Sequence, residues 1–525
     1  MSRDTGRQVG LLIDRMGVVD KVVVGDAHQL VIPDLGRDRA GAARFRGLRL
    51  VHTHLRNEAL ARDDLTDLAL LRLDGVLVVH AGSDGLPGAL ELAHLLPPGS
   101  AEPHRVERIP AVHAWEHDFT TFIRDLEHQF RQAAALRDVP GRENAVLVSV
   151  TTEDPRRAQR TLEELERLAE TAGLHTVDRV LQVRRELDGR TLVGQGKLRE
   201  LVLRCMHLGA GVIVFDQELS PSQLRNIATE TELKVLDRTQ LILDIFSQRA
   251  TTKEGKLQVE LAQLRYRKPR LALMPTAMSR LTGGIGGRGP GETKLEINRR
   301  RADERETRLQ RQLAEIARAR AMRRDRRRRV GLPLVAIVGY TNAGKSTLLN
   351  TLTRSAVTAT DSLFATLDPT SRRLRFVAAE RDEDGAVACP SAPAEIVLTD
   401  TVGFIRDLPR DLVHAFRSTL DEALEADLLL HVADASDEDV EAQKASVEAV
   451  LRALGAGEVP CLVVLNKADA ADPELLDERA RAWDATPVVA RTGEGLGPLL
   501  ARIERALWRA SERDDAEGVA ADPDR

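Results

Sequence analysis

One short stretch restricts the fold of this chain more than any other: an apolar strand at 335–338, a glycine-rich turn, and a helical run that starts at 347. In such a turn the glycines let backbone N–H groups point inward at phosphate groups, and the following helix adds the positive end of its dipole. The strand and the helix around the turn disfavour the alternative of a plain glycine turn. The pattern predicts a parallel α/β sheet with a phosphate-binding loop made of Gly339, Tyr340, Thr341, Asn342, Ala343, Gly344, Lys345 and Ser346.

Two side chains of this loop have expected chemical roles. Lys345 should reach the β- and γ-phosphates of a nucleotide, and the Ser346 hydroxyl should bind Mg²⁺. A second motif follows an expected strand at 395–399. Its acidic residue can hold Mg²⁺ through water, and its glycine can follow the γ-phosphate through its backbone N–H. This motif consists of Asp400, Thr401, Val402 and Gly403.

A third motif decides which base is bound. It follows an apolar strand at 461–465 and consists of Asn466, Lys467, Ala468 and Asp469. A carboxylate here can accept two hydrogen bonds from the N1–H and exocyclic amine of guanine, whereas adenine offers no such donor pair. Three ordered motifs therefore predict an enzyme that hydrolyses GTP to GDP and phosphate.

Two further segments fall where such an enzyme contacts its nucleotide. The segment 364–370 lies between the first two motifs, and from spacing alone both Thr366 and Thr370 qualify as the Mg²⁺-binding switch threonine. After an expected strand at 488–489, Val489, Ala490 and Arg491 occupy the position of a Ser-Ala-Lys-like segment that contacts the base through its backbone. Valine replaces the serine there, a change that backbone contact tolerates.

Length and composition indicate several domains in a reducing compartment. The chain has 525 residues, which suggests three or four domains, and its net charge is −5. Cys205, Cys389 and Cys461 are far apart, so we expect neither a disulfide scaffold nor a zinc ribbon. We find no signal peptide and no membrane span, and we expect a cytoplasmic protein.

Pattern changes along the chain predict five segments. Residues 1–140 are an N-terminal extension with strands at 22–24, 48–51 and 76–79 and a helix at 63–73; residues 141–252 alternate strands at 145–150, 212–215 and 234–236 with helices at 158–172 and 198–208. Residues 253–329 form an antiparallel helical hairpin with a glycine-rich tip at 283–291, and 330–510 form the nucleotide-binding domain. Residues 511–525 are an acidic tail that we expect to be disordered.

Longer motifs resemble one known family. Besides the motifs above, Asp-Thr-Val-Gly-Phe-Ile-Arg-Asp-Leu-Pro at 400–409, Asp-Ile-Phe-Ser-Gln-Arg-Ala at 244–250 and the glycine-rich segment at 279–294 are similar to the HflX family of ribosome-associated GTPases, of the Obg-HflX class. The resemblance covers roughly residues 141–510 and leaves 1–140 outside the family core. It implies a P-loop GTPase domain, with a mostly parallel sheet and helices on both faces, preceded by a small α/β domain and a long helical hairpin.

The resemblance also implies roles that spacing leaves open. It assigns the switch threonine to Thr366 rather than Thr370, which gives Ser346 and Thr366 as metal ligands and Lys345, Thr366 and Gly403 as the catalytic set. It places along the nucleotide the residues Phe364, Ala365, Thr366, Leu367 and Asp368. The family is implied to bind the large ribosomal subunit and its RNA, with the hairpin tip towards the peptidyl-transferase region, and to split, rescue or recycle stalled ribosomes under stress. We expect a monomer.

Two residues raise mechanistic questions. Phe404 stands where many GTPases carry a Gln that orients the attacking water, so we expect slow intrinsic hydrolysis completed by another group. The alternative is that Phe404 is a core residue. Asn342 occupies a position similar to that of an asparagine that helps to hold K⁺ in potassium-activated GTPases, where a cation would stabilise charge. A side chain that caps the loop is an equal alternative.

Two alternatives concern partners and metals. The arginine-rich stretch 318–329 suits RNA phosphates, or else it is a solvated helix face, and the chain could be a GTP-dependent switch or RNA-binding scaffold whose hydrolysis the ribosome does not stimulate. His52 and His54, followed by Asp63 and Asp64, distantly resemble a metalloprotease His-x-His…Asp site. Because the spacing differs and the intervening Ser is absent, the sequence disfavours a metal role.

Overall fold

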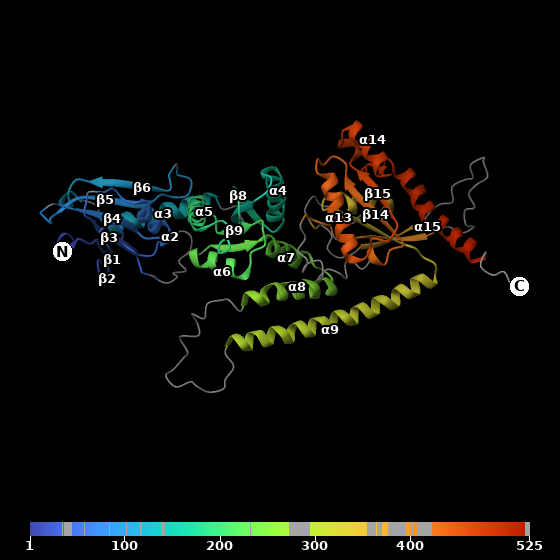
Figure 1. The fold of residues 1–525 in the computed structure, drawn as a ribbon, viewed down its shortest axis with the longest axis horizontal. Helices are drawn as coiled ribbons and strands as arrows, with labels where there is room; N and C mark the ends of the chain where they lie inside the picture. The colour runs from blue at the N-terminus through green and yellow to red at the C-terminus, as the bar shows by residue number, and fades with distance from the viewer. Residues whose placement is uncertain are drawn as a thin grey trace. The chain divides into compact units, whose positions relative to one another are not determined.

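The computed structural model describes residues 1–519 except 34, 36–44, 57, 83, 101, 116–117, 138–141, 232, 272–293, 354–363, 365–369, 376–394, 402 and 407–422. The chain divides into two compact units, Met1–Leu241 and Ile242–Arg525 (Figure 1). None of the helices in the described part of the chain is long and apolar enough to cross a membrane.

The first unit begins with a six-stranded mixed sheet in the order β2-β1-β3-β4-β5-β6. Only β3 and β4 are parallel neighbours, and α2 connects them. The elements are α1 (Ser2–Thr5), β1 (Val9–Asp14), β2 (Val19–Val24), β3 (Leu48–His54), α2 (Arg62–Leu70), β4 (Gly75–Ala81), β5 (Pro87–Leu95), β6 (His104–Ile109), η1 (Val112–Ala114) and α3 (Phe119–Arg137).

A single apolar core lies between one face of this sheet and two helices. Leu50 and Val76 of the sheet pack in one cluster with Leu68 of α2 and Ile123 of α3. The strands β2, β3 and β4 and the helix α2 were predicted from the sequence, although α2 ends at Leu70 instead of 73. It ends there because Arg72 adopts a left-handed φ of 50°, which a helix cannot continue through.

A four-stranded parallel sheet, in the order β10-β9-β7-β8, completes the first unit. Its elements are β7 (Glu143–Thr151), α4 (Pro155–Thr171), β8 (Leu174–Val183), α5 (Gln195–Leu208), β9 (Val212–Phe215), α6 (Pro221–Glu230), β10 (Lys234–Asp237) and α7 (Arg238–Arg249), the last of which continues into the second unit. Val146 and Val148 of β7 pack with Leu198 of α5 and Ile227 of α6. This arrangement confirms the predicted small α/β part with a parallel sheet.

The second unit contains the predicted antiparallel helical hairpin, formed by α8 (Lys253–Leu271) and α9 (Lys294–Arg329). Ion pairs join the two helices along their length: Arg265 Nε lies 3.0 Å from Glu306 Oε1, and Arg320 Nη2 lies 2.7 Å from Glu254 Oε2. Figure 1 shows the helices side by side. The predicted glycine-rich tip at 283–291 lies outside the described residues.

The other part of this unit is the predicted nucleotide-binding domain. Its sheet has the order β12-β13-β11-β14-β15-β16, and all neighbouring strands are parallel except β12 and β13. Its elements are β11 (Leu334–Gly339), α10 (Lys345–Thr353), β12 (Thr370–Arg375), β13 (Glu395–Asp400), β14 (Leu428–Asp434), α13 (Val440–Leu454), β15 (Cys461–Asn466), η3 (Ala468–Ala470), α14 (Pro473–Ala482), β16 (Thr486–Pro487) and α15 (Leu496–Val519).

Helices cover both faces of this sheet because the residues of β11 alternate between two cores. Ile337 packs with Leu348 of α10 and Leu499 of α15, whereas Ala336 packs with Val447 of α13. The last helix corrects one expectation: α15 continues to Val519, so the tail predicted to be disordered from 511 begins within a helix. Four of its residues between 511 and 519 are good helix formers, namely Glu512, Arg513, Ala516 and Glu517, and they extend a helix that begins at Leu496.

Candidate functional site

The phosphate-binding loop connects β11 to α10 and is held against the base-recognition motif by Asn466. This side chain is 3 % exposed. Its Nδ2 donates to the Ala343 carbonyl oxygen (2.8 Å), and its Oδ1 accepts from the Ala490 N–H (2.9 Å). Gly344 has a φ of 91°, and a Cβ there would collide with the Asn466 amide. Asn466, which belongs to the base-recognition motif, thus links the phosphate-binding loop to the predicted base-contacting segment 489–491.

Lys345 and Gly403 meet at one point beside the loop. The Lys345 side chain is buried, and its Nζ donates to the Tyr340 carbonyl oxygen (2.8 Å). Burial lowers the pKa of this ammonium to about 8, although the nearby Asp400 acts in the opposite direction. A Cβ on Gly403 would lie 3.1 Å from Lys345 Nζ. Only glycine lets this backbone approach so closely, and a cation next to a backbone N–H is suited to a phosphate oxygen.

Ser346 and Asp400 form a pair of oxygen donors next to Lys345. Ser346 Oγ donates to Asp400 Oδ2 (2.6 Å), and Asp400 is fully buried at the end of β13, beside β11. A hydroxyl and a carboxylate in contact are hard oxygen ligands of the kind that Mg²⁺ prefers. The residues present therefore fit this ion.

The predicted guanine-recognition motif contains one link that the sequence did not reveal. Lys467 has a left-handed φ of 58°, and its Nζ lies 2.6 Å from Asp434 Oδ2 at the end of β14. Asp434 could have been found as the polar residue that ends a buried parallel strand, where such sites gather. Asp469 is about half exposed, and Arg491 Nη2 lies 3.5 Å from its carboxylate. The Arg491 side chain thus pairs with the carboxylate of the base-recognition motif, whereas the sequence predicted only a backbone contact for this segment.

The comparisons with known proteins agree with this geometry. Residues 159–247 match the family model described as GTP-binding GTPase N-terminal, 249–327 match GTP-binding GTPase Middle Region, and 334–467 match 50S ribosome-binding GTPase. A GTPase HflX of Lacrimispora saccharolytica is 46% identical over 365 residues, which cover 70% of this chain and 83% of that protein. The chain belongs to the HflX family of GTPases. It accordingly hydrolyses GTP.

Further relatives give the same result for this HflX-family chain. The GTPase HflX of Escherichia coli is 42% identical over 369 residues, which cover 70% of this chain and 83% of that protein. Among solved structures, the chain is similar to a GTP-binding protein of Sulfolobus solfataricus in complex with GDP, with 23% identity and a TM-score of 0.37 over 70% of this chain and 99% of that chain.

Phe404 of this HflX GTPase is a core residue, one of the two alternatives left open by the sequence. Its side chain is 2 % exposed and packs in one cluster with Tyr340. Its backbone donates to the Gly339 carbonyl (3.1 Å) and accepts from the Thr341 N–H (2.7 Å). Phe404 therefore fastens the second motif to the phosphate-binding loop and does not face an attacking water.

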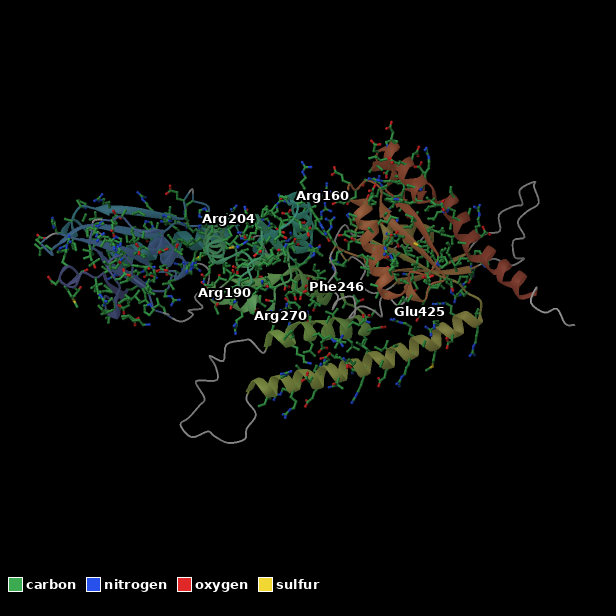
Figure 2. All side chains as sticks on the ribbon, in the orientation of Figure 1. Arg160, Arg190, Arg204, Phe246, Arg270 and Glu425 are labelled. Carbon is green, nitrogen blue, oxygen red and sulfur yellow. The ribbon has the colours of Figure 1, made fainter. Side chains whose placement is uncertain are left out.

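The switch segment is described only in part. Phe364 is buried with a φ of 57°, and its ring packs edge-on against Phe246 of α7, with ring centroids 4.6 Å apart (Phe246 is labelled in Figure 2). Thr370 begins β12 and is paired with Asp400. The predicted site residues that lie outside the described part are Ala365, Thr366, Leu367, Asp368 and Val402. Their contacts with nucleotide stay predictions.

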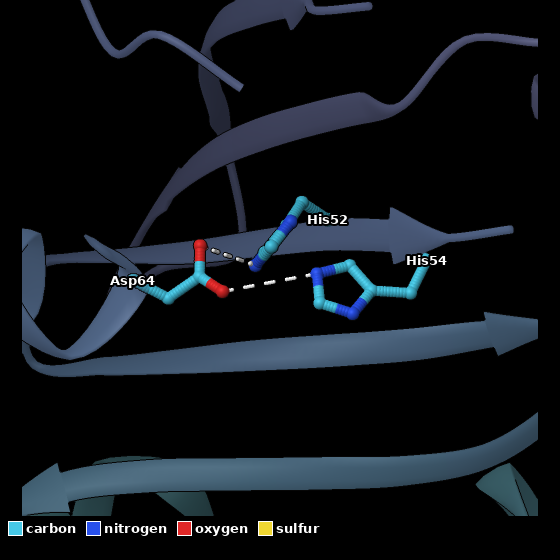
Figure 3. Close-up of side chains that lie close together, drawn as sticks. All are labelled: His52, His54 and Asp64. Carbon is cyan, nitrogen blue, oxygen red and sulfur yellow. Dashed lines mark ion pairs between the residues drawn. The ribbon is translucent and has the colours of Figure 1, made fainter. Parts of the chain in front are cut away.

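The structure brings together three residues for which the sequence disfavoured a metal role. Ligand atoms of His52, His54 and Asp64 all lie within 4.8 Å of one another, and Figure 3 shows both histidines facing the carboxylate. The spacing argument concerned a metal role and not this proximity, which strand register and the start of α2 set. Asp63 is not part of the cluster.

Proposed function

We propose that this GTPase binds the large ribosomal subunit and uses GTP binding and hydrolysis to split, rescue or recycle stalled ribosomes under stress. It would act as a monomer in the cytoplasm, with Mg²⁺ held by Ser346 and Thr366 to neutralise charge on the phosphates. The observation that carries the proposal is the match of residues 334–467 to the family described as 50S ribosome-binding GTPase.

The hairpin beside the GTPase domain suits an RNA partner. The helix α9 has 36 residues, which span about 54 Å at 1.5 Å per residue. Between 294 and 329 it carries fifteen Lys or Arg against six Asp or Glu. A long basic helix of this kind reads the backbone and shape of RNA rather than its sequence.

Ion pairs divide the arginines of α9 into two groups. Arg320 pairs with Glu254 of α8, and Arg324 Nη1 lies 3.1 Å from Glu425, labelled in Figure 2. These two arginines brace the helix within its own unit. Arg311, Arg318 and Arg329 are exposed, so contacts with RNA phosphates would fall to residues of this second group.

The test is GTP turnover with and without purified large ribosomal subunits. Stimulation of about tenfold or more, equivalent to about 1.4 kcal/mol of barrier, supports the proposal. Arg318→Glu should weaken subunit binding and reduce its salt dependence, while basal turnover stays unchanged. Arg481→Glu is the matched control, because Arg481 is also exposed but lies on α14.

Turnover that large subunits leave unchanged, with nucleotide binding intact, would contradict the proposal. It would favour the alternative of a GTP-dependent switch or RNA-binding scaffold. Equal loss of subunit binding in Arg318→Glu and Arg481→Glu would show that α9 has no special part in the contact.

A further inference from the structure

The core of the N-terminal sheet contains a polar cluster where apolar residues would be expected. Alternate residues of a strand face the same side, so Leu50, His52 and His54 of β3 all point to the side covered by α2 and α3. Leu50 belongs to the apolar core. His52 and His54 are 1 % and 4 % exposed, and Asp64 stands in the first turn of α2.

Hydrogen bonds from the described residues leave the buried His52 imidazole unsatisfied. Within the described part of the chain, neither ring nitrogen of His52 has a hydrogen-bond partner. An unsatisfied buried polar group lowers the stability of the folded state by about 1–3 kcal/mol. Such groups are rare in folded proteins, and a bound ion is one explanation for them.

The orientation of His54 points its free nitrogen at Asp64. His54 Nδ1 donates to the backbone carbonyl oxygen of Glu58 (2.7 Å), so Nε2 is the ring nitrogen that faces Asp64. That nitrogen lies 3.7 Å from Asp64 Oδ2, and His52 Nε2 lies 3.4 Å from Asp64 Oδ1. Lone pairs of nitrogen and carboxylate oxygen repel each other unless a cation lies between them.

His52 Nε2 and Asp64 Oδ1 are as far apart as two ligands of a tetrahedral ion, whereas the separation of His54 Nε2 from Asp64 Oδ2 is about 0.3 Å longer. Nitrogen and oxygen ligands about 2.0–2.1 Å from Zn²⁺ lie about 3.3–3.4 Å apart. The bond from His54 Nδ1 to a backbone carbonyl is the usual way in which a metal-binding histidine is held in position. Asp64 Oδ2 is held similarly, because it accepts from the Ala61 N–H (2.9 Å).

We propose that His52, His54 and Asp64 bind a divalent transition-metal ion of the Zn²⁺ type. Two imidazoles and one carboxylate are a ligand set that Zn²⁺ accepts, and they leave a fourth coordination position open. His80 and Glu91 extend the polar cluster: His80 is paired with His54 across β3 and β4, and its Nε2 lies 3.6 Å from Glu91 Oε1. The site lies in the unit that does not contain the GTPase site, and it does not depend on the ribosomal proposal.

The experiment uses the full-length chain purified without a polyhistidine tag. Metal content is measured by mass spectrometry, Zn²⁺ affinity by competition with a coloured chelator, and coordination by the visible absorption of added Co²⁺. The ligand variants are Asp64→Asn and His54→Gln, which preserve side-chain size. His94→Gln is the matched control, because His94 is a buried histidine of the same sheet whose Nδ1 bonds to the Leu95 carbonyl, outside the cluster.

We expect one bound Zn²⁺ per chain with an affinity tighter than micromolar. Both ligand variants should weaken it by about 100-fold or more, since loss of a ligand costs at least as much as loss of a supporting residue. Zn²⁺ should raise the unfolding temperature of the unmodified chain and of His94→Gln, but not that of Asp64→Asn. Turnover of GTP without partners should be the same in all of them, which checks the folding of the second unit, and an unchanged unfolding temperature without Zn²⁺ checks the folding of the N-terminal sheet.

Three outcomes would overturn the assignment. The first is absence of Zn²⁺ binding by the unmodified chain, which would leave a proton as the cation between His54 and Asp64. The second is unchanged Zn²⁺ affinity in Asp64→Asn. The third is an equal loss of affinity in His94→Gln, which would show a general effect on the sheet rather than a ligand set.

Discussion

The nucleotide site and the histidine cluster of the N-terminal sheet are built in opposite ways. The phosphate-binding loop takes eight consecutive residues, from Gly339 to Ser346, and its chemistry is carried largely by backbone groups. The cluster takes two residues from β3 and one from α2, and its chemistry is carried by side chains alone. A contiguous motif prescribes its own geometry, whereas a cluster of this kind exists only once strand register is fixed.

The largest expected effect tests whether the contiguous motif acts as its sequence indicates. Lys345→Ala should lower GTP turnover by about 100-fold or more, because it removes a buried cation that we expect to reach the transferring phosphoryl group. Single-turnover kinetics at saturating GTP measure this directly. The matched variant is Lys444→Ala. The half-buried Lys444 ammonium pairs with Glu448 of α13, and its removal should leave turnover unchanged. Similar losses in the two variants would contradict the assigned role.

Much of the fold was predictable because its strands are short apolar runs. Val212–Phe215 was predicted with its observed bounds, as β9 is buried on both faces and reads as an unbroken apolar run. The strand β8 was missed, because most of its residues are only half-buried and polar residues such as Asp178 and Arg179 interrupt it. The strand at 104–109 was missed for a similar reason, since most of β6 is exposed.

In the nucleotide site and in the histidine cluster, the contacts between residues far apart in the sequence were the part that could not be predicted. The partners of Asn466 could not be predicted, since Ala343 and Ala490 are far from it in sequence and meet it only through the order of the parallel strands. The histidine cluster was disfavoured because it was compared with a spacing pattern, while its distances depend on how β3 lies against α2. In both places the residue types were visible in the sequence and their neighbours were not.

The second prediction concerns Phe404, which occupies the position of a catalytic Gln in many GTPases but is a core residue here. Phe404→Gln restores the residue that many GTPases carry at this position, yet we expect no gain in turnover, because the side chain is buried against Tyr340. It should instead lower the free energy of unfolding by about 3 kcal/mol, through lost apolar burial and a buried amide. Urea unfolding followed by tryptophan fluorescence gives the stability.

A conservative variant at the same position separates packing from chemistry. Phe404→Leu should cost only about 1 kcal/mol, because it keeps most of the apolar volume. If Phe404→Gln were as stable as the unmodified chain and turned over faster, the side chain would reach the attacking water and the core assignment would be wrong.

The smallest effect concerns Asn342, where the motif itself leaves two chemistries open. If its side chain helps to hold K⁺, turnover in K⁺ should exceed that in Na⁺ by about threefold or more at equal ionic strength, about 0.7 kcal/mol of barrier. Equal rates would refute a K⁺ role. The structure adds a competing reason for an asparagine: the residue is exposed and has a left-handed φ of 62°, which asparagine tolerates better than most residues.

Asn342→Gly distinguishes these reasons, because glycine adopts the same φ without strain and lacks only the side chain. If the amide oxygen binds K⁺, this variant loses the difference between the two salts while its turnover in Na⁺ stays unchanged. If asparagine is present only for its backbone conformation, the response to K⁺ survives in the glycine variant. A contiguous motif would then prescribe backbone geometry even where its side chain resembles a ligand.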